Sequence, residues 1–282
     1  MIFRQHRLRY LLAGGFHQLA WTEWGPEDGA PVVCVHGLTR TGRDFDALAE
    51  ALAQRGRRVL CPDLPGRGAS GWLPVPALYT PPCYVLALAH LLARLDGPMD
   101  WVGTSLGGIC GMMVAAGTDT PLRRLVLNDI GARVPAEAIA RIGTYLKLPA
   151  AFADMAALEA HLRRIHAPFG PLTDAQWRHL AETGMRRLPD GRIALHYDPA
   201  IAIPFAEGEN GTVELGPVWQ RVAAPVLLLR GAESDVLPAE VAAEMAARPG
   251  VELVEWQGIG HAPALMDPAQ IGRVTAFLDG LG

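Results

Sequence analysis

The sequence predicts an α/β fold, in which helices cover both faces of a mostly parallel β-sheet. Short apolar runs of strand-forming residues alternate with longer segments of helical spacing, and this order implies crossover connections. The runs at residues 31–35 and 225–229 are apolar throughout, which is typical of strands buried on both faces. Between about Arg133 and Phe205 the alternation stops and only helical patterns remain, which predicts an insertion.

The elements before the insertion follow one another regularly. Phe16 to Trp24 alternates polar and apolar residues, as a half-exposed antiparallel strand does. The segment from Tyr84 to Leu95 places four leucines on one helical stripe. The expected strands of this part are 16–24, 31–35, 57–61, 99–102 and 125–127, and the expected helices are 44–54, 84–95 and 106–116.

Within the insertion, helices are expected over 138–146, 155–166 and 174–183, the last with an N-cap at Thr173 or Asp174. Strands at 225–229 and 252–256 and helices at 238–247 and 268–278 complete the pattern. We therefore expect residues 1–131 and 211–282 to form the α/β core. Residues 132–210 are expected to form a helical cap over the carboxyl edge of the sheet.

The composition restricts the class of protein. The chain has 282 residues, 50% of them hydrophobic, which predicts one compact domain with an insertion rather than a disordered chain. A net charge of -4 argues against nucleic-acid binding. No apolar run approaches the roughly 20 residues of a membrane helix, and Met1 to Tyr10 lacks the apolar centre of a signal peptide. We expect a cytoplasmic monomer or homodimer without nucleic-acid or membrane partners.

The strongest chemical signal is the motif Gly103-Thr104-Ser105-Leu106-Gly107. It lies directly between an expected strand and an expected helix, which is the setting that a G-x-S-x-G nucleophile requires. The tight turn exposes the Ser105 hydroxyl above the sheet, and glycines on either side allow the two backbones to approach closely. Ser105 is therefore the candidate nucleophile.

A serine hydroxyl needs a neighbouring base, and the base needs an acid that orients it. His261 lies after the final strand, on the same rim of the sheet as Ser105, and is the candidate base. The favoured acid is Asp235, which follows the strand at 225–229. Asp129, at the end of the strand at 125–127, and Glu233, in the same loop as Asp235, remain alternatives.

Acyl transfer also needs two N–H donors for the oxyanion. The N–H of Leu106, directly after the nucleophile, is one candidate. The N–H of Leu38 is the other, because Gly37 permits the backbone twist that points it inward. His36 is interpreted as structural. Arg40 could contact a substrate carboxylate, although an exposed loop arginine is the preferred interpretation.

Five features follow one another along the chain in this order: His36-Gly37, the motif Asp63-Leu64-Pro65-Gly66-Arg67-Gly68, the Ser105 turn, the Asp235 loop and the His261 loop. On these features the chain resembles the α/β-hydrolase superfamily over nearly its whole length. The resemblance implies an eight-stranded sheet with an antiparallel second strand, a cap over the active site, and neither a metal nor an organic cofactor. It also implies that the motif from Asp63 to Gly68 is a structural turn beside the nucleophile.

The expected reaction is hydrolysis of a small carboxylic ester or lactone through an acyl-enzyme on Ser105. The alternatives are a carbon–carbon bond hydrolase of ring-cleavage dienoates and a non-catalytic small-molecule binder. The candidate substrate-binding residues are Arg40 and the cap aromatics Tyr145, Phe169, Trp177, Tyr197 and Phe205.

Overall fold

The computed structural model describes residues 3–147, 151–204 and 211–280. An eight-stranded sheet crosses its centre in the order β1-β2-β4-β3-β5-β6-β12-β13. β2 is antiparallel to β1 and β4, and the remaining neighbours pair in parallel, so the expected sheet is confirmed. The strands are β1 (Arg4–Leu12), β2 (Gly15–Trp24), β3 (Pro31–Val35), β4 (Arg58–Asp63), β5 (Met99–Thr104), β6 (Leu122–Asn128), β12 (Val226–Gly231) and β13 (Val251–Trp256).

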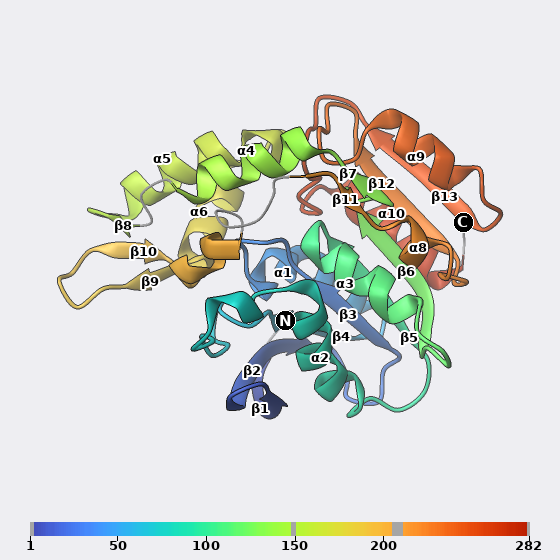
Figure 1. Ribbon diagram of the computed structural model, residues 1–282, viewed down its shortest axis with the longest axis horizontal. Helices are drawn as coiled ribbons and strands as arrows, with labels where there is room; N and C mark the ends of the chain where they lie inside the picture. Colours follow the sequence, from blue (N-terminus) through green and yellow to red (C-terminus); the bar gives the residue numbers. More distant parts are fainter. Residues whose placement is uncertain (1–2, 148–150, 205–210, 281–282) are drawn as a thin grey trace.

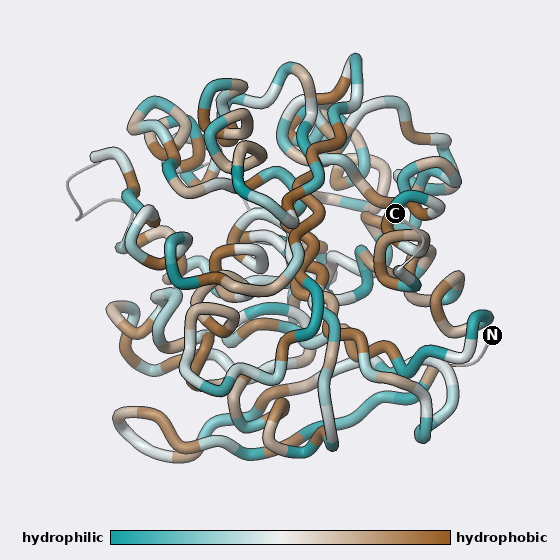
Figure 2. Tube along the Cα trace, turned by 90° about the vertical axis from the view of Figure 1, so that its right-hand side faces the viewer, coloured by the Kyte–Doolittle hydropathy of each residue, from teal (hydrophilic) through white to brown (hydrophobic). Residues whose placement is uncertain are grey.

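The central strands are apolar on both faces because each face packs against helices. In β3, Val33 and Val35 belong to one buried cluster, whereas Val32 and Cys34 belong to the other. The hydrophobic stretches accordingly gather in the middle of the molecule (Figure 2). The first cluster includes residues of α2 (Pro81–Leu92), α3 (Leu106–Ala115), α8 (Gly216–Trp219) and α9 (Ala239–Ala246). The second includes residues of α1 (Asp46–Gln54) and α10 (Pro268–Asp279).

Two features of the first hundred residues differ from the sequence prediction. β1 was not expected, because its first four residues are all polar and its alternation is confined to a few residues around the buried Leu8, Tyr10 and Leu12. α2 begins at Pro81 rather than at Tyr84. Proline is well accommodated in a first helical turn, where its missing N–H costs no hydrogen bond, so the two prolines start this helix.

The segment between β6 and β12 is helix-rich, as expected. Its elements are β7 (Arg133–Val134), α4 (Ala136–Leu146), β8 (Ala151–Phe152), α5 (Met155–Ile165), α6 (Asp174–Thr183), β9 (Met185–Arg187), β10 (Ile193–Leu195) and β11 (Val213–Glu214), with short 3₁₀ turns at Ala167–Phe169 and Pro199–Ala202. The five strands were not predicted, because each has only two or three residues and none is an apolar run of ordinary strand length.

These inserted helices gather at the upper left of Figure 1, apart from α9 and α10. The segment lies against the loops that follow the parallel strands: the Gly68 N–H donates to the His196 carbonyl at 2.9 Å, and α6 contacts the 3₁₀ turn at Gly42–Phe45. It therefore covers the rim where strand-end side chains meet. The domain limits at residues 132 and 210 stay a prediction. Residues 205–210, including Phe205, lie outside the described residues.

In the part of the chain that the structure describes, no helix has both the length and the apolar character needed to cross a bilayer.

Candidate active site

The Ser105 turn is strained, as the sequence predicts. Ser105 has a φ of 51°, a conformation that costs a non-glycine residue free energy and that clusters at functional sites. A Cβ on Gly107 would lie 1.9 Å from the Val35 carbonyl oxygen, and one on Gly103 would lie 2.4 Å from the Gly107 backbone. Only glycine fits these two positions, so β3, β5 and α3 can close around the serine.

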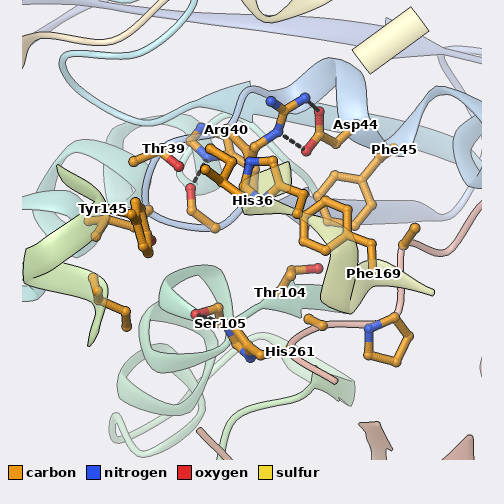
Figure 3. Close-up of a pocket in the computed structure, with 18 of the residues that line it drawn as sticks. His36, Thr39, Arg40, Asp44, Phe45, Thr104, Ser105, Tyr145, Phe169 and His261 are labelled. Atoms are coloured by element: carbon orange, nitrogen blue, oxygen red, sulfur yellow. Dashed lines mark hydrogen bonds and ion pairs between the residues drawn. The ribbon is translucent and has the colours of Figure 1, made fainter. Parts of the chain in front are cut away.

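His261 lies beside Ser105. Its Nε2 is 3.0 Å from the Ser105 Oγ, within hydrogen-bond distance, and the imidazole is mostly buried. Figure 3 shows the two side chains together at the floor of a cavity. The loop after β13 thus brings the expected base to the expected nucleophile across 156 residues of sequence.

The carboxylate beside His261 is that of Asp129. Its Oδ2 is 2.6 Å from His261 Nδ1 and accepts a hydrogen bond from the Ser234 hydroxyl at 2.5 Å. Its Oδ1 accepts from the Gly231 N–H at 2.9 Å. Asp129 is completely buried, and three donors compensate for the cost of removing its charge from water. The structure therefore favours the alternative acid of the sequence analysis.

The prediction that Asp235 orients His261 is wrong. The Asp235 carboxylate is 47% exposed and forms a two-point ion pair with Arg141 of α4, at 2.5 and 2.9 Å. The loop after β12 does reach the site, but it contributes Ser234, which donates to Asp129. Glu233, the third candidate, is exposed in the same loop.

The Leu38 loop is held by a neutral histidine. His36 Nδ1 is 2.6 Å from the Gly37 carbonyl oxygen, and His36 Nε2 accepts from the Leu64 N–H at 2.9 Å. Since the C=O and N–H of a trans peptide point in opposite directions, fixing the Gly37 carbonyl also fixes the direction of the Leu38 N–H. Burial lowers the pKa of His36 to about 3, so the ring stays uncharged near neutral pH. Its structural interpretation is confirmed.

This buried histidine should make the protein sensitive to acid. Because the pKa of His36 in the folded protein lies below the usual value of about 6.5, the unfolded chain binds a proton at pH values where the folded protein does not. The stability contribution is present above about pH 6.5 and is lost as the pH falls toward about 3, on the order of 5 kcal/mol in all. We expect His36→Gln to be less stable at pH 7.5 but to lose less stability between pH 6.5 and 4, measured by urea unfolding.

Replacement of the partly exposed His90 on α2 by Gln is the control for the His36 variant and should keep the wild-type slope. Burial raises the pKa of Asp63 to about 6, which opposes the slope, but this contribution is common to all three proteins. Equal slopes for the wild type and His36→Gln would contradict the prediction.

The motif from Asp63 to Gly68 also stabilises the loop that contains Leu38. Asp63 accepts from the N–H groups of Gly42 and Ala69, both at 2.8 Å. Arg67 is fully buried and donates through Nε to the Leu38 carbonyl at 2.8 Å and through Nη1 to the Tyr84 hydroxyl at 2.9 Å. The motif is therefore more than the structural turn that the sequence predicts, because Arg67 also holds the loop with the candidate oxyanion donor Leu38.

Leu106 is the first residue of α3, and the first N–H groups of a helix have no carbonyl acceptor within that helix. Ser105 itself is tied to the neighbouring strand by its N–H, which donates to the Asn128 carbonyl at 3.0 Å. Leu38 lines the same cavity as Ser105. The roles of Leu38 and Leu106 as oxyanion donors stay predictions.

The cavity above Ser105 has a volume of about 70 Å³ and is enclosed by the core loops on one side and the inserted segment on the other. Tyr145 and Phe169 line it, and Figure 3 shows both facing the region above Ser105. His166, stacked on Phe169, also lines it, and burial holds the pKa of His166 well below its usual range. Apolar side chains and uncharged polar groups therefore form much of the wall.

Three expected substrate-binding residues lie elsewhere or are otherwise engaged. Trp177 does not line the cavity, because it points from α6 into the hydrophobic core and is 5% exposed. Arg40 lines the cavity but is not the exposed loop arginine that was preferred. It is buried and forms two hydrogen bonds with Asp44, both at 2.8 Å (Figure 3). Tyr197 lines a smaller neighbouring cavity.

Comparison with known proteins gives a consistent result. The model of the alpha/beta hydrolase family matches residues 32–273. The 3-hydroxybutyrate-oligomer hydrolase of Cupriavidus necator is 43% identical over 277 residues, 94% of each chain. An alpha/beta hydrolase structure from Novosphingobium aromaticivorans has a TM-score of 0.86 and 36% identity, covering 98% of both chains. A structure from Rickettsia typhi has a TM-score of 0.91 and 29% identity, covering 99% of both chains.

The nucleophile turn, the sheet order and the family match over residues 32–273 agree with one another. The chain therefore belongs to the α/β hydrolase family.

Proposed function

We propose that this protein is a serine hydrolase that cleaves carboxylic esters of short 3-hydroxy acids, with oligomers of 3-hydroxybutyrate as its substrate class. The observation that carries the proposal is the chain of contacts from Asp129 through His261 to Ser105 at the floor of a cavity. The substrate class is supported by the 43% identity to the oligomer hydrolase of Cupriavidus necator over nearly the whole chain.

In this mechanism the Ser105 hydroxyl attacks the ester carbonyl carbon while His261 Nε2 takes its proton. Asp129 keeps the remaining proton on Nδ1 and stabilises the imidazolium. The oxyanion accepts hydrogen bonds from the N–H groups of Leu38 and Leu106. His261 then protonates the departing alcohol, and a water molecule activated by the same imidazole releases the acid and restores Ser105.

The inserted segment, as the proposed cap, restricts the length of the acyl group. Its part of the cavity lining consists of Ile142 and Tyr145 of α4, Ile165 of α5, and His166 and Phe169 directly after α5. At about 70 Å³ the cavity is small beside the roughly 300–1,000 Å³ of pockets for drug-sized ligands, which favours a short acyl unit over a long fatty chain.

We expect the purified protein to release 3-hydroxybutyrate from its dimer and trimer, measured by liquid chromatography. We also expect p-nitrophenyl butyrate to be cleaved with a kcat/KM at least about tenfold above that of p-nitrophenyl dodecanoate, because each badly placed methylene costs about 1–3 kcal/mol. Cleavage of the aryl ester with no release from the oligomers would refute the substrate class. Binding of the oligomers without turnover of any ester would point to a non-catalytic binder instead.

A further inference from the structure

Two arginines, Arg40 and Arg141, line the cavity above Ser105, and their surroundings differ. Arg40 is 5% exposed, and its guanidinium is occupied by Asp44 and by the Leu180 carbonyl, which accepts from Nη2 at 3.1 Å. Arg40 therefore links the core to α6, and its guanidinium has a structural role. Arg141 instead extends from α4 with a side chain that is 42% exposed.

Arg141 lies on the cavity side of α4. Ile142 follows it directly, and Tyr145 lies one helical turn further on, where residues four apart share a face. Both line the cavity together with Arg141 and Ser105. The Arg141 guanidinium therefore lies where the cavity meets solvent, and it brings a positive charge to a wall that otherwise offers mostly apolar and uncharged groups.

The contact that Arg141 makes with Asp235 has the geometry of carboxylate recognition. Its Nε and Nη2 donate to the two oxygens of Asp235 at 2.5 and 2.9 Å, which is the parallel two-point arrangement that guanidinium favours. Asp235 is 47% exposed. Ion pairs this accessible contribute little stability because water and salt screen them, so another carboxylate can take the place of Asp235 at small cost.

We propose that Arg141 forms a carboxylate-binding subsite at the mouth of the cavity, and that Asp235 occupies it until a substrate carboxylate displaces it. This inference rests on the proposed function for its choice of substrate. In an oligomer of a hydroxy acid, the free carboxylate belongs to the alcohol half of the terminal ester. Arg141 thus binds the leaving group and directs cleavage to the end of the oligomer that carries the charge.

The test compares the 3-hydroxybutyrate dimer with the same dimer whose terminal carboxylate is replaced by a carboxamide. We expect the wild type to prefer the acid, and Arg141→Gln to lower kcat/KM for the acid by about 10- to 100-fold, mainly through KM, as expected for a hydrogen-bonded charge. The loss for the amide should be much smaller, so the preference disappears. Asp235→Asn should lower KM for the acid several-fold, because the competing carboxylate is gone.

Arg133→Gln is the matched control. Arg133 is a partly exposed arginine just before α4 that lies near Glu244 and does not line the cavity, so its replacement should leave the acid-to-amide ratio unchanged. Equal losses on both dimers in Arg141→Gln, or a retained preference for the acid, would overturn the inference.

A binding measurement separates this inference from the proposed function. In the Ser105→Ala background, titration calorimetry with 3-hydroxybutyrate should show binding that weakens about tenfold or more when Arg141 is also replaced by Gln. If this holds while the wild type fails to cleave the dimer, the substrate class is wrong and the carboxylate subsite stands. If the dimer is cleaved but binding is independent of Arg141, the subsite is wrong and the function stands.

Discussion

Replacing Ser105 with alanine is expected to lower kcat for p-nitrophenyl butyrate by about 10⁴- to 10⁶-fold, while the fold is retained. The Ser105 Oγ lies 3.0 Å from His261 Nε2, and without it no covalent acyl-enzyme can form. The remaining rate enhancement should come from substrate binding and from the N–H groups of Leu38 and Leu106. Steady-state kinetics with enzyme at high concentration would measure the loss, and circular dichroism would show that the variant is folded.

Because the chain has few serines, covalent labelling provides a second test that Ser105 is the nucleophile. The chain contains only Ser70, Ser105 and Ser234. Ser70 is buried and its hydroxyl donates to the Asp63 carbonyl, and the Ser234 hydroxyl donates to Asp129. A fluorophosphonate should therefore add once, at Ser105, as located by peptide mass spectrometry, and should not add to Ser105→Ala. Undiminished turnover in Ser105→Ala, or an adduct on another residue, would exclude the proposed mechanism.

The sheet was predictable because its physical signals are local. Strands that are buried on both faces must be apolar at every position, and this is visible in the sequence at β3 and β12. β1 was missed because its first four residues are all polar, so the alternation around Leu8 and Tyr10 is too short to indicate a strand by itself. The short strands of the inserted segment were missed for a different reason. Ladders of two or three residues depend on contacts between distant segments rather than on any pattern within them.

The meeting of Ser105 and His261, the proposed nucleophile and base, was predictable because backbone geometry restricts the residues around them. Gly103 and Gly107 are required by the close approach of β3, β5 and α3, so the G-x-S-x-G motif by itself indicates the strained turn. The acid was different, because two strand ends, after β6 and after β12, lie next to each other in the sheet. A carboxylate from either can approach His261, and the order of residues along the chain does not distinguish them. The choice depends on where each side chain points.

The hydrogen bonds around the two carboxylates make that choice. Asp129 is buried, and Gly231, Ser234 and His261 direct donors at it. Asp235 lies one residue beyond Ser234 but faces solvent and Arg141. The loop after β12 therefore supports the Asp129 carboxylate, at the end of the neighbouring strand, instead of supplying the carboxylate beside His261 itself. Sequence order favoured Asp235 because the loop is in the right place, although the side chain is not.

Asp129→Asn should consequently lower kcat by about 10⁴-fold. Asparagine has nearly the shape of aspartate, but its amide offers one acceptor oxygen where Gly231, Ser234 and His261 now share two. His261 would lose the partner that keeps the proton on Nδ1, so Nε2 could no longer act reliably as the base. The imidazolium formed during the attack would also lose its counter-charge. The effect should fall on kcat far more than on KM, measured with p-nitrophenyl butyrate, because the ester itself does not contact Asp129 in the mechanism.

Glu233→Gln is the matched control, since Glu233 is an exposed carboxylate in the adjoining loop and should retain wild-type kinetics. Asp235→Asn provides the discriminating comparison. It is expected to change KM for carboxylate-bearing substrates through Arg141, with a kcat that stays at least about a thousandfold above that of Asp129→Asn. Thermal unfolding of all three variants would separate a catalytic loss from a folding defect, because leaving buried donors unpaired costs about 1–3 kcal/mol. A larger loss of kcat in Asp235→Asn than in Asp129→Asn would restore Asp235 as the acid, since it would mean that the loop after β12 turns inward during turnover.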